Sequence, residues 1–246
     1  MENTHFKLFN HSSEDMQEIE DNSVDLIAFS PPYNTIACYD SVSDTKTWED
    51  YKTMMTKIIS ECFRVLKKEG ALFIESADSV FSHNKYVALA GMLQSIALKQ
   101  GFNLITRNIS FVRIKKNIEL PDHGWDENYF AKRAAHSNCQ QHLIFSKNKK
   151  KIVEGKINYF SYPQDHDYAN ENQGDYDHPC PYPKKLINFI LDNYFKKGFT
   201  VLDTFAGTCG LGEEVLKREG NFIGFDLSKK YLDIGEKKMK NALEKV

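Results

Sequence analysis

The stretch VDLIAFSPPY, residues 24–33, joins an apolar run to a hydroxyl group, two prolines and an aromatic ring. The run at 24–29 is typical of a buried strand. Proline has no N–H group for the hydrogen-bond ladder of a sheet, so the strand must end at Pro31 and Pro32. The tip of this strand is therefore presented to something outside the sheet.

The composition excludes several classes of protein. A chain of 246 residues is long enough for one large α/β domain, and 41% hydrophobic with 27% charged residues excludes disordered and collagen-like classes. No apolar run approaches the roughly 20 residues of a membrane span, and the N-terminus lacks the order of a signal peptide, so we expect a cytoplasmic protein with no membrane partner. Five scattered cysteines without a C-x-x-C pair indicate free thiols, and we expect no metal site.

Short apolar runs alternate with amphipathic stretches, which predicts an α/β fold with a mostly parallel sheet flanked by helices. We expect strands at 5–9, 24–29, 71–76, 102–114, 142–146, 200–205 and 221–226. We expect helices from Ser12 or Ser13 to Glu20, and at 48–66, 86–99, 183–195, 211–218 and 229–243, with Gly70 ending a turn and Ser228 capping the last helix. Residues 149–181 have no periodicity and are predicted to form a long irregular insertion.

A second signal lies near the C-terminus, in TVLDTFAGTCGLGEEVLKREGNFIGFDLS, residues 200–228. It has the order strand, small-residue turn, helix and strand of a nucleotide-binding βαβ unit, in which the backbone approaches the ligand closely and the helix N-terminus offers N–H groups. Asp226, at the tip of the second strand, can accept from ribose hydroxyls. Cys209 stands where a glycine is expected, so a tight turn without a ligand is the alternative, and Asp203 also suits a capping or turn position.

The two signals share one position in the predicted fold, because each follows the C-terminus of a strand. In open α/β sheets, ligands bind outside these strand ends. If the strands at 24–29 and 200–205 are neighbours, a nucleotide at Gly207 would lie beside Ser30 and Tyr33.

VDLIAFSPPYN, FAGTCG and IGFD, in that order, resemble the S-adenosylmethionine-dependent DNA amino-methyltransferases, in the permuted class whose catalytic motif precedes its cofactor motif. The resemblance covers nearly the whole chain. It implies a Rossmann-like methyltransferase fold, one catalytic domain at 1–246, S-adenosylmethionine as cofactor, and double-stranded DNA as partner. In this family a serine in S-P-P-Y most often accompanies methylation of the N4 amine of cytosine. Some serine versions methylate the N6 amine of adenine, so adenine is the alternative base.

The resemblance assigns catalysis to the strand tip. An exocyclic amine is a poor nucleophile, because its lone pair delocalises into the ring. The Ser30 hydroxyl and the Pro31 carbonyl would accept from its two hydrogens, while Pro31 and Pro32 hold the chain extended. Tyr33 would stack on a target base flipped out of the duplex. The alternatives are a core aromatic for Tyr33 and a helix-capping role for Ser30.

The cofactor pocket is expected around the second motif. Asp226 would accept from the ribose hydroxyls, and the backbone of residues 205–208 would hold the methionine portion. The residues that the resemblance places in this pocket are His178, Tyr182, Asp203, Phe205, Ala206, Gly207, Thr208, Asp226 and Leu227.

Target recognition is expected in a small insertion at about 148–177, which is acidic and contains several tyrosines; residues 119–133, with Trp125 and Arg133, are a second candidate. The net charge of −2 means that contacts to phosphates must come from local patches such as Lys115–Lys116. A homodimer and a cognate restriction endonuclease are further partners that the family allows, and RNA stays open as a substrate.

Two rival functions come from other classes. A nicotinamide-dependent oxidoreductase would use the same βαβ unit, but it leaves S-P-P-Y unexplained. A non-catalytic nucleic-acid-binding partner would have lost its cofactor pocket, with Cys209 as the hint.

Overall fold

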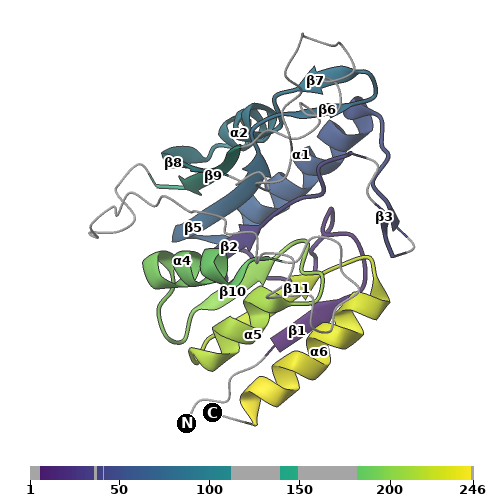
Figure 1. The fold of residues 1–246 in the computed structure, drawn as a ribbon. Helices are drawn as coiled ribbons and strands as arrows, with labels where there is room; N and C mark the ends of the chain where they lie inside the picture. Colours follow the sequence, from purple (N-terminus) through teal and green to yellow (C-terminus); the bar gives the residue numbers. More distant parts are fainter. Residues whose placement is uncertain (1–5, 36–37, 41, 112–138, 149–181, 245–246) are drawn as a thin grey trace.

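The computed structural model describes residues 6–35, 38–40, 42–111, 139–148 and 182–244, and its centre is a seven-stranded sheet (Figure 1). In spatial order the strands are β1 (Phe6–Phe9), β11 (Asn221–Phe225), β10 (Thr200–Asp203), β2 (Val24–Phe29), β5 (Leu66–Ala77), β9 (Cys139–Ser146) and β8 (Asn103–Phe111). The pairs from β1 to β5 are parallel, whereas β9 is antiparallel to both of its neighbours. The predicted mostly parallel sheet is therefore confirmed.

Helices cover both faces of the sheet. The helices α1 (Trp48–Val65) and α2 (Leu89–Lys99) share one hydrophobic cluster with Ile27 and Phe29 of β2. The helices α4 (Lys184–Tyr194), α5 (Gly210–Lys217) and α6 (Lys229–Leu243) share another with Leu26 and Ala28. Alternate residues of β2 thus enter opposite cores, which is why the strand is a continuous apolar run in the sequence.

Two hairpins accompany the sheet (Figure 1). One pairs β3 (Cys38–Tyr39) with β4 (Val42–Ser43) after β2. The other pairs β6 (Val80–Ser82) with β7 (Lys85–Val87) after β5, around a two-residue turn in which His83 and Asn84 have left-handed φ angles of 53° and 58°. The sequence prediction of a helix from residue 86 is therefore wrong at its start, because residues 85–87 pair as a strand and the helix begins at Leu89.

The helix predicted between Ser12 and Glu20 is also wrong. The Ser13 hydroxyl donates to the Thr204 carbonyl at 3.0 Å, and the Met16 N–H donates to the Glu61 carboxylate at 2.9 Å. These bonds attach an irregular segment to the sheet and to α1. The polar groups that would cap a helix are therefore engaged in tertiary contacts, and no helix forms.

Gly70 lies inside β5 and does not end a turn, contrary to the prediction. A Cβ atom at this position would lie 2.8 Å from the Asp25 carbonyl oxygen, so the close approach of β2 and β5 requires glycine. By contrast, the predicted cap of α6 is confirmed, because the Ser228 hydroxyl accepts from the Tyr231 N–H at 3.2 Å.

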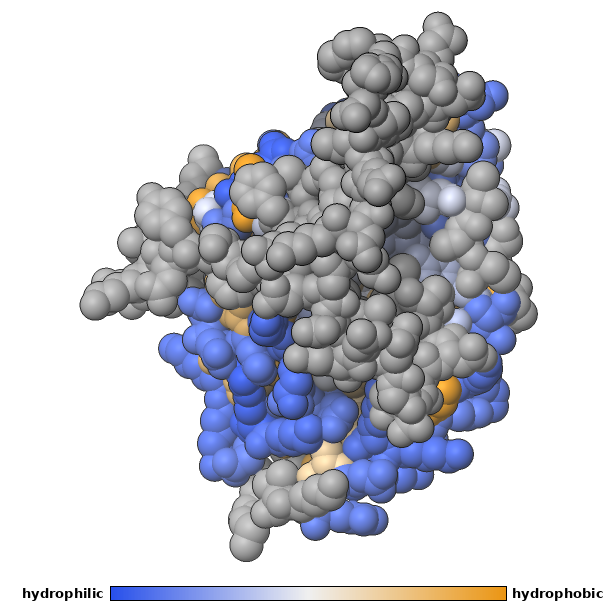
Figure 2. All heavy atoms as spheres, in the orientation of Figure 1, coloured by the Kyte–Doolittle hydropathy of each residue, from blue (hydrophilic) through white to orange (hydrophobic). Residues whose placement is uncertain are grey.

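The surface of the described residues is largely hydrophilic on the face that Figure 2 shows. Large apolar side chains that are exposed are Tyr86, Leu98, Ile109 and Leu227. Within the described ranges, the helices are too short or too polar to cross a bilayer.

The contact between α6 and the turn that follows β10 makes a testable prediction about stability. A Cβ atom at Gly235 would overlap the Cys209 sulfur and lie 2.7 Å from the Cys209 Cβ atom. We expect Gly235→Ala to lower the free energy of unfolding by roughly 1–3 kcal/mol, measured by urea denaturation.

Cys209→Gly should reduce this loss in the double variant, because glycine removes the overlapping atoms and tolerates the left-handed φ of 56° at this position. A double variant that loses the sum of the two single losses would contradict the assigned overlap.

Candidate active site

The two sequence signals meet at one edge of the sheet. Strands β2 and β10 are parallel neighbours, with Val201 opposite Leu26 and Leu202 opposite Ile27. Directly beyond these pairs, the rings of Phe29 and Phe205 lie 5.6 Å apart, centre to centre. The expectation that the strands at 24–29 and 200–205 are neighbours is confirmed, and the tip of β2 lies beside the turn that follows β10.

The loop after β2, residues 30–34, is named here the SPPYN loop. Pro31 is buried, whereas Ser30, Pro32 and Tyr33 are half-buried, with Tyr33 packed against the core on the α1 side. The loop ends at Asn34, which is fully buried and has a left-handed φ of 57°.

Glu75 lies beside Ser30 and was missed by the sequence analysis. Phe29 of β2 is opposite Ile74 of β5, so the next step of the parallel register brings Ser30 next to Glu75. The Ser30 hydroxyl hydrogen-bonds to the Glu75 carboxylate, and Glu75 is 4% exposed. Burial raises the pKa of Glu75 to about 7, while the bond from Ser30 opposes the rise. A carboxylate inside the otherwise apolar run at 71–77 was the signal that could have revealed it.

His142 is the cross-strand partner of Glu75 on β9. It is buried, its Nε2 atom lies 3.0 Å from the Ser110 hydroxyl, and its ring packs on Phe73 and Phe189. Burial lowers the pKa of His142 to about 4, so the imidazole is neutral at pH 7. Polar side chains of the SPPYN loop, β5, β9 and β8 therefore follow one another across the sheet, in the order Ser30, Glu75, His142 and Ser110.

The turn after β10 is shaped by its own amide groups. Phe205 N–H donates to the Asp203 carboxylate at 2.9 Å, Ala206 N–H to the Phe225 carbonyl at 2.8 Å, and Gly207 N–H to the Asp226 carboxylate at 2.8 Å. These bonds hold the turn against the end of β11, and Thr208 is buried within it.

Two carboxyl groups lie beside this turn, Asp203 buried and Asp226 half-buried. Burial and the nearby charge of Asp226 raise the pKa of Asp203 to about 8, and burial also raises the pKa of Asp226. Asp226 accepts from Gly207 N–H and Ser228 N–H, but a carboxylate has further lone pairs for ribose hydroxyls. A ligand that carries hydroxyl donors and a positive charge fits this acidic site.

Cys209 packs against α6. It is fully buried, and its side chain contacts Gly235 of α6. The residue that departs from the glycine-rich pattern therefore fills the space between the turn and α6.

Of the other residues predicted for the cofactor pocket, Leu227 and Tyr182 are among the described residues, whereas His178 is not. Leu227 is 54% exposed directly after Asp226, and its backbone is held by the Asn10 side chain, which donates to the carbonyls of both residues at 3.0 Å. Tyr182 is partly buried against the core beneath α4. His178 lies outside the described residues, as do the predicted recognition segment at 119–133 and, apart from Asn148, the one at about 148–177.

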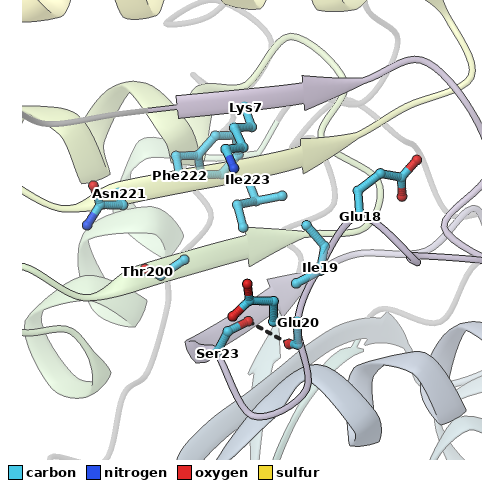
Figure 3. Close-up of a pocket in the computed structure, with 9 residues that line it drawn as sticks. All are labelled: Lys7, Glu18, Ile19, Glu20, Ser23, Thr200, Asn221, Phe222 and Ile223. Carbon is cyan, nitrogen blue, oxygen red and sulfur yellow. Dashed lines mark hydrogen bonds between the residues drawn. The ribbon is translucent and has the colours of Figure 1, made fainter.

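A separate pocket of about 280 Å³ lies away from these groups (Figure 3). Thr200 and Asn221, which begin β10 and β11, contribute to its wall together with Lys7, Ile19 and Ser23. It therefore opens near the amino-terminal ends of the strands, whereas the two motifs meet at the carboxyl ends.

Comparison with protein families decides the classification. Residues 24–237 match the family model for N6 and N4 methyltransferases, described as DNA methylase. The chain belongs to the DNA methylase family. The match includes β2, β5, β10 and β11, the strands whose ends form the site.

Individual DNA methylases support this assignment. The chain is 25% identical over 246 residues to type II methyltransferase M.BglII of Bacillus subtilis, covering 93% of this chain and 67% of the relative. It is 22% identical over 241 residues to DNA adenine methyltransferase YhdJ of Escherichia coli (strain K12), covering 92% and 79%. The fold is similar to that of the cytosine-N4-specific PvuII DNA methyltransferase, with a TM-score of 0.69, 16% identity and coverage of 98% and 92%.

The DNA methylase uses S-adenosylmethionine, and a structural neighbour was solved in complex with this molecule. Its ribose hydroxyls and positive sulfonium match the acidic site at Asp203 and Asp226. The family match therefore excludes the alternative that the protein is a nicotinamide-dependent oxidoreductase. Among the residues described, no three His, Cys, Asp or Glu side chains gather closely enough to hold a metal ion.

The raised pKa of Glu75 predicts a pH-dependent stability. Because the folded state holds this proton up to about pH 7 and the unfolded chain releases it near 4.5, the group stabilises fully below pH 4.5 and loses its contribution as the pH rises through 7. Glu75→Gln should reduce the fall of the free energy of unfolding between pH 4.5 and 7 by up to about 1.4 kcal/mol per pH unit, measured by denaturant titration.

Glu69→Gln is the matched control, since Glu69 is exposed on the same strand. Equal slopes for the wild type and Glu75→Gln would contradict a protonated Glu75 in the folded state.

Proposed function

We propose that this DNA methylase transfers a methyl group from S-adenosylmethionine to the exocyclic N4 amine of a cytosine in DNA. The observation that carries the proposal is the place of the Ser30 hydroxyl. Ser30 directly follows β2, hydrogen-bonds to buried Glu75 of β5, and lies near the turn that follows β10. The serine in S-P-P-Y favours cytosine N4 over adenine N6. The relatives include an adenine methyltransferase and the structural neighbours a cytosine-N4 enzyme, so adenine is the second candidate.

Ser30 and Pro31 would prepare the amine for attack. The Ser30 hydroxyl donates its own proton to Glu75, which leaves the Ser30 oxygen as an acceptor for one N–H of the amine. The Pro31 carbonyl would accept from the second N–H. Both bonds draw the nitrogen lone pair out of conjugation with the ring, and catalysis rests on this positioning and preorganisation.

When bound, S-adenosylmethionine supplies the methyl group, so that the C–N bond forms while the S–C bond breaks and sulfur keeps the electron pair. The amine must then lose one proton. This proton would pass to the Ser30 oxygen as the Ser30 hydroxyl proton passes to Glu75, whose pKa near 7 suits it as the acceptor.

The target base must leave the duplex to reach this site, since base edges inside the stack do not reach a buried strand end. Tyr33 would provide the stacking surface, worth roughly 1–3 kcal/mol. Recognition of the DNA sequence is assigned to the insertion at about 148–177. We place the protein in the cytoplasm; a homodimer and a cognate restriction endonuclease remain further proposals.

The identity of the base is tested by incubating the protein with tritiated S-adenosylmethionine and unmethylated genomic DNA, followed by nucleoside analysis. The proposal expects label in N4-methylcytosine. Label confined to N6-methyladenine would establish the second candidate, and DNA binding without any transfer would establish the non-catalytic alternative.

Ser30→Ala should lower the rate of methyl transfer by about 10²-fold or more, because an acceptor for the amine and the link to Glu75 are both lost. The affinity for S-adenosylmethionine should stay within twofold, measured by calorimetry. Ser95→Ala on the exposed face of α2 is the control. If cofactor affinity collapses in Ser30→Ala, the assignment of Ser30 to the amine is wrong.

The wild-type rate should fall as the pH falls through about 7, since protonation of Glu75 removes the proton acceptor. Glu75→Gln should lower the single-turnover rate by about 10-fold or more and remove this dependence. A Glu75→Gln enzyme with the wild-type rate and pH profile would exclude Glu75 from proton transfer.

A further inference from the structure

Tyr51 joins the buried core to the SPPYN loop. Its ring, on α1, is fully buried and packs edge-on against Trp48, with 5.5 Å between ring centres. Its hydroxyl donates to the Pro32 carbonyl oxygen at 2.7 Å. Burial holds the pKa of Tyr51 well above its ordinary value, so the hydroxyl keeps its proton at every working pH.

This bond restrains ψ of Pro32, which the proline rings leave free, whereas ψ of Pro31 is already restricted to extended values because Pro32 follows it. The pyrrolidine rings fix φ at Pro31 and Pro32, but ψ of Pro32 can still rotate. That rotation changes the direction of the Pro32 carbonyl and the position of Tyr33. The Tyr51 hydroxyl fixes the carbonyl, and with it the start of Tyr33.

The same bond gives the two proline carbonyls different roles, because it engages the Pro32 carbonyl, whereas the proposed contact to the amine uses the Pro31 carbonyl. In an extended polyproline-like segment, with about three residues per turn, successive carbonyls point in different directions. The Pro32 carbonyl is turned to α1 and is already occupied by Tyr51. In such a segment the Pro31 carbonyl would point in a different direction from the Pro32 carbonyl, as the proposed contact to the amine requires.

The far end of the loop is held independently. The Asn34 side chain exchanges two hydrogen bonds of 2.8 Å with the backbone of Lys46. The backbone carbonyl of Asn34 accepts from the Ser82 hydroxyl of β6 at 2.5 Å. Tyr33 thus lies between two anchors, Tyr51 on one side and Asn34 on the other. The groups that bond to the loop, Tyr51, Lys46 and Ser82, lie outside β2, so the shape of the loop does not depend on the strand alone.

We propose that Tyr51 is a positioning residue for methyl transfer, whose hydroxyl holds Pro32 so that the Pro31 carbonyl faces the amine and Tyr33 faces the target base. This inference rests on the proposed role of the SPPYN loop. It separates the ring of Tyr51, which fills the core, from the hydroxyl, which acts only on the loop. Tyr51→Phe removes the hydroxyl and keeps the ring.

The test measures single-turnover methyl transfer to unmethylated genomic DNA at saturating S-adenosylmethionine, with rates divided by the number of cofactor-binding sites so that unfolded protein does not contribute. Tyr51→Phe should lower this rate by about 5- to 100-fold, because a displacement near 1 Å at a reacting group can cost about 10²-fold. Affinity for S-adenosylmethionine should remain within twofold, which gives the split between rate and binding that a purely structural role would not produce.

Tyr194→Phe is the matched control, because Tyr194 packs into the other core at the C-terminal end of α4 and should keep the wild-type rate. Ser30→Ala separates the two proposals. If Ser30→Ala is slow and Tyr51→Phe keeps the wild-type rate, the inference about Tyr51 is overturned and the proposed function stands. If Ser30→Ala also keeps the wild-type rate, the proposed function fails and the inference fails with it.

Discussion

The parallel pairing of β2 with β10 is the constraint on which the site depends. It places residues about 175 positions apart in the sequence at the same edge of one sheet, where the rings of Phe29 and Phe205 contact each other. The S-P-P-Y motif precedes the F-A-G-T-C-G turn in the chain by most of its length, yet the sheet makes them neighbours. Sequence order is therefore irrelevant to the chemistry as long as both strands run in the same direction.

Buried and half-buried carboxyl groups give this edge its chemical character. Glu75 lies beside Ser30 of the SPPYN loop, while Asp203 and Asp226 accept from amides of the turn after β10, and burial raises the pKa of all three. Such groups are costly in a core unless they are bonded or protonated. Glu75 accepts from Ser30 and the two aspartates accept from turn amides, so the groups that shape the site are also those poised to exchange protons or meet a charged ligand.

Elements whose apolar residues recur at a regular spacing were predicted well from the sequence. β2, α1, α4 and β11 have the predicted type and nearly the predicted ends, because burial of one or both faces dictates their pattern. Predictions that relied on a single local signal failed. Serine is a common helix cap, but the Ser13 hydroxyl donates to the Thr204 carbonyl and no helix forms after it. Glycine is common in turns, but Gly70 lies in β5, where a side chain would collide with the Asp25 carbonyl oxygen.

The sequence by itself determined the family motifs, the alternation of strands and helices, and the residues of both strand tips, because these follow from local residue types and their spacing. Only the tertiary structure decided that Glu75 meets Ser30, that Tyr51 holds Pro32, and that Cys209 faces α6. The physical reason is that each of these contacts depends on strand register or helix placement. Both are set by packing between segments that are distant in the chain, and no local pattern encodes them.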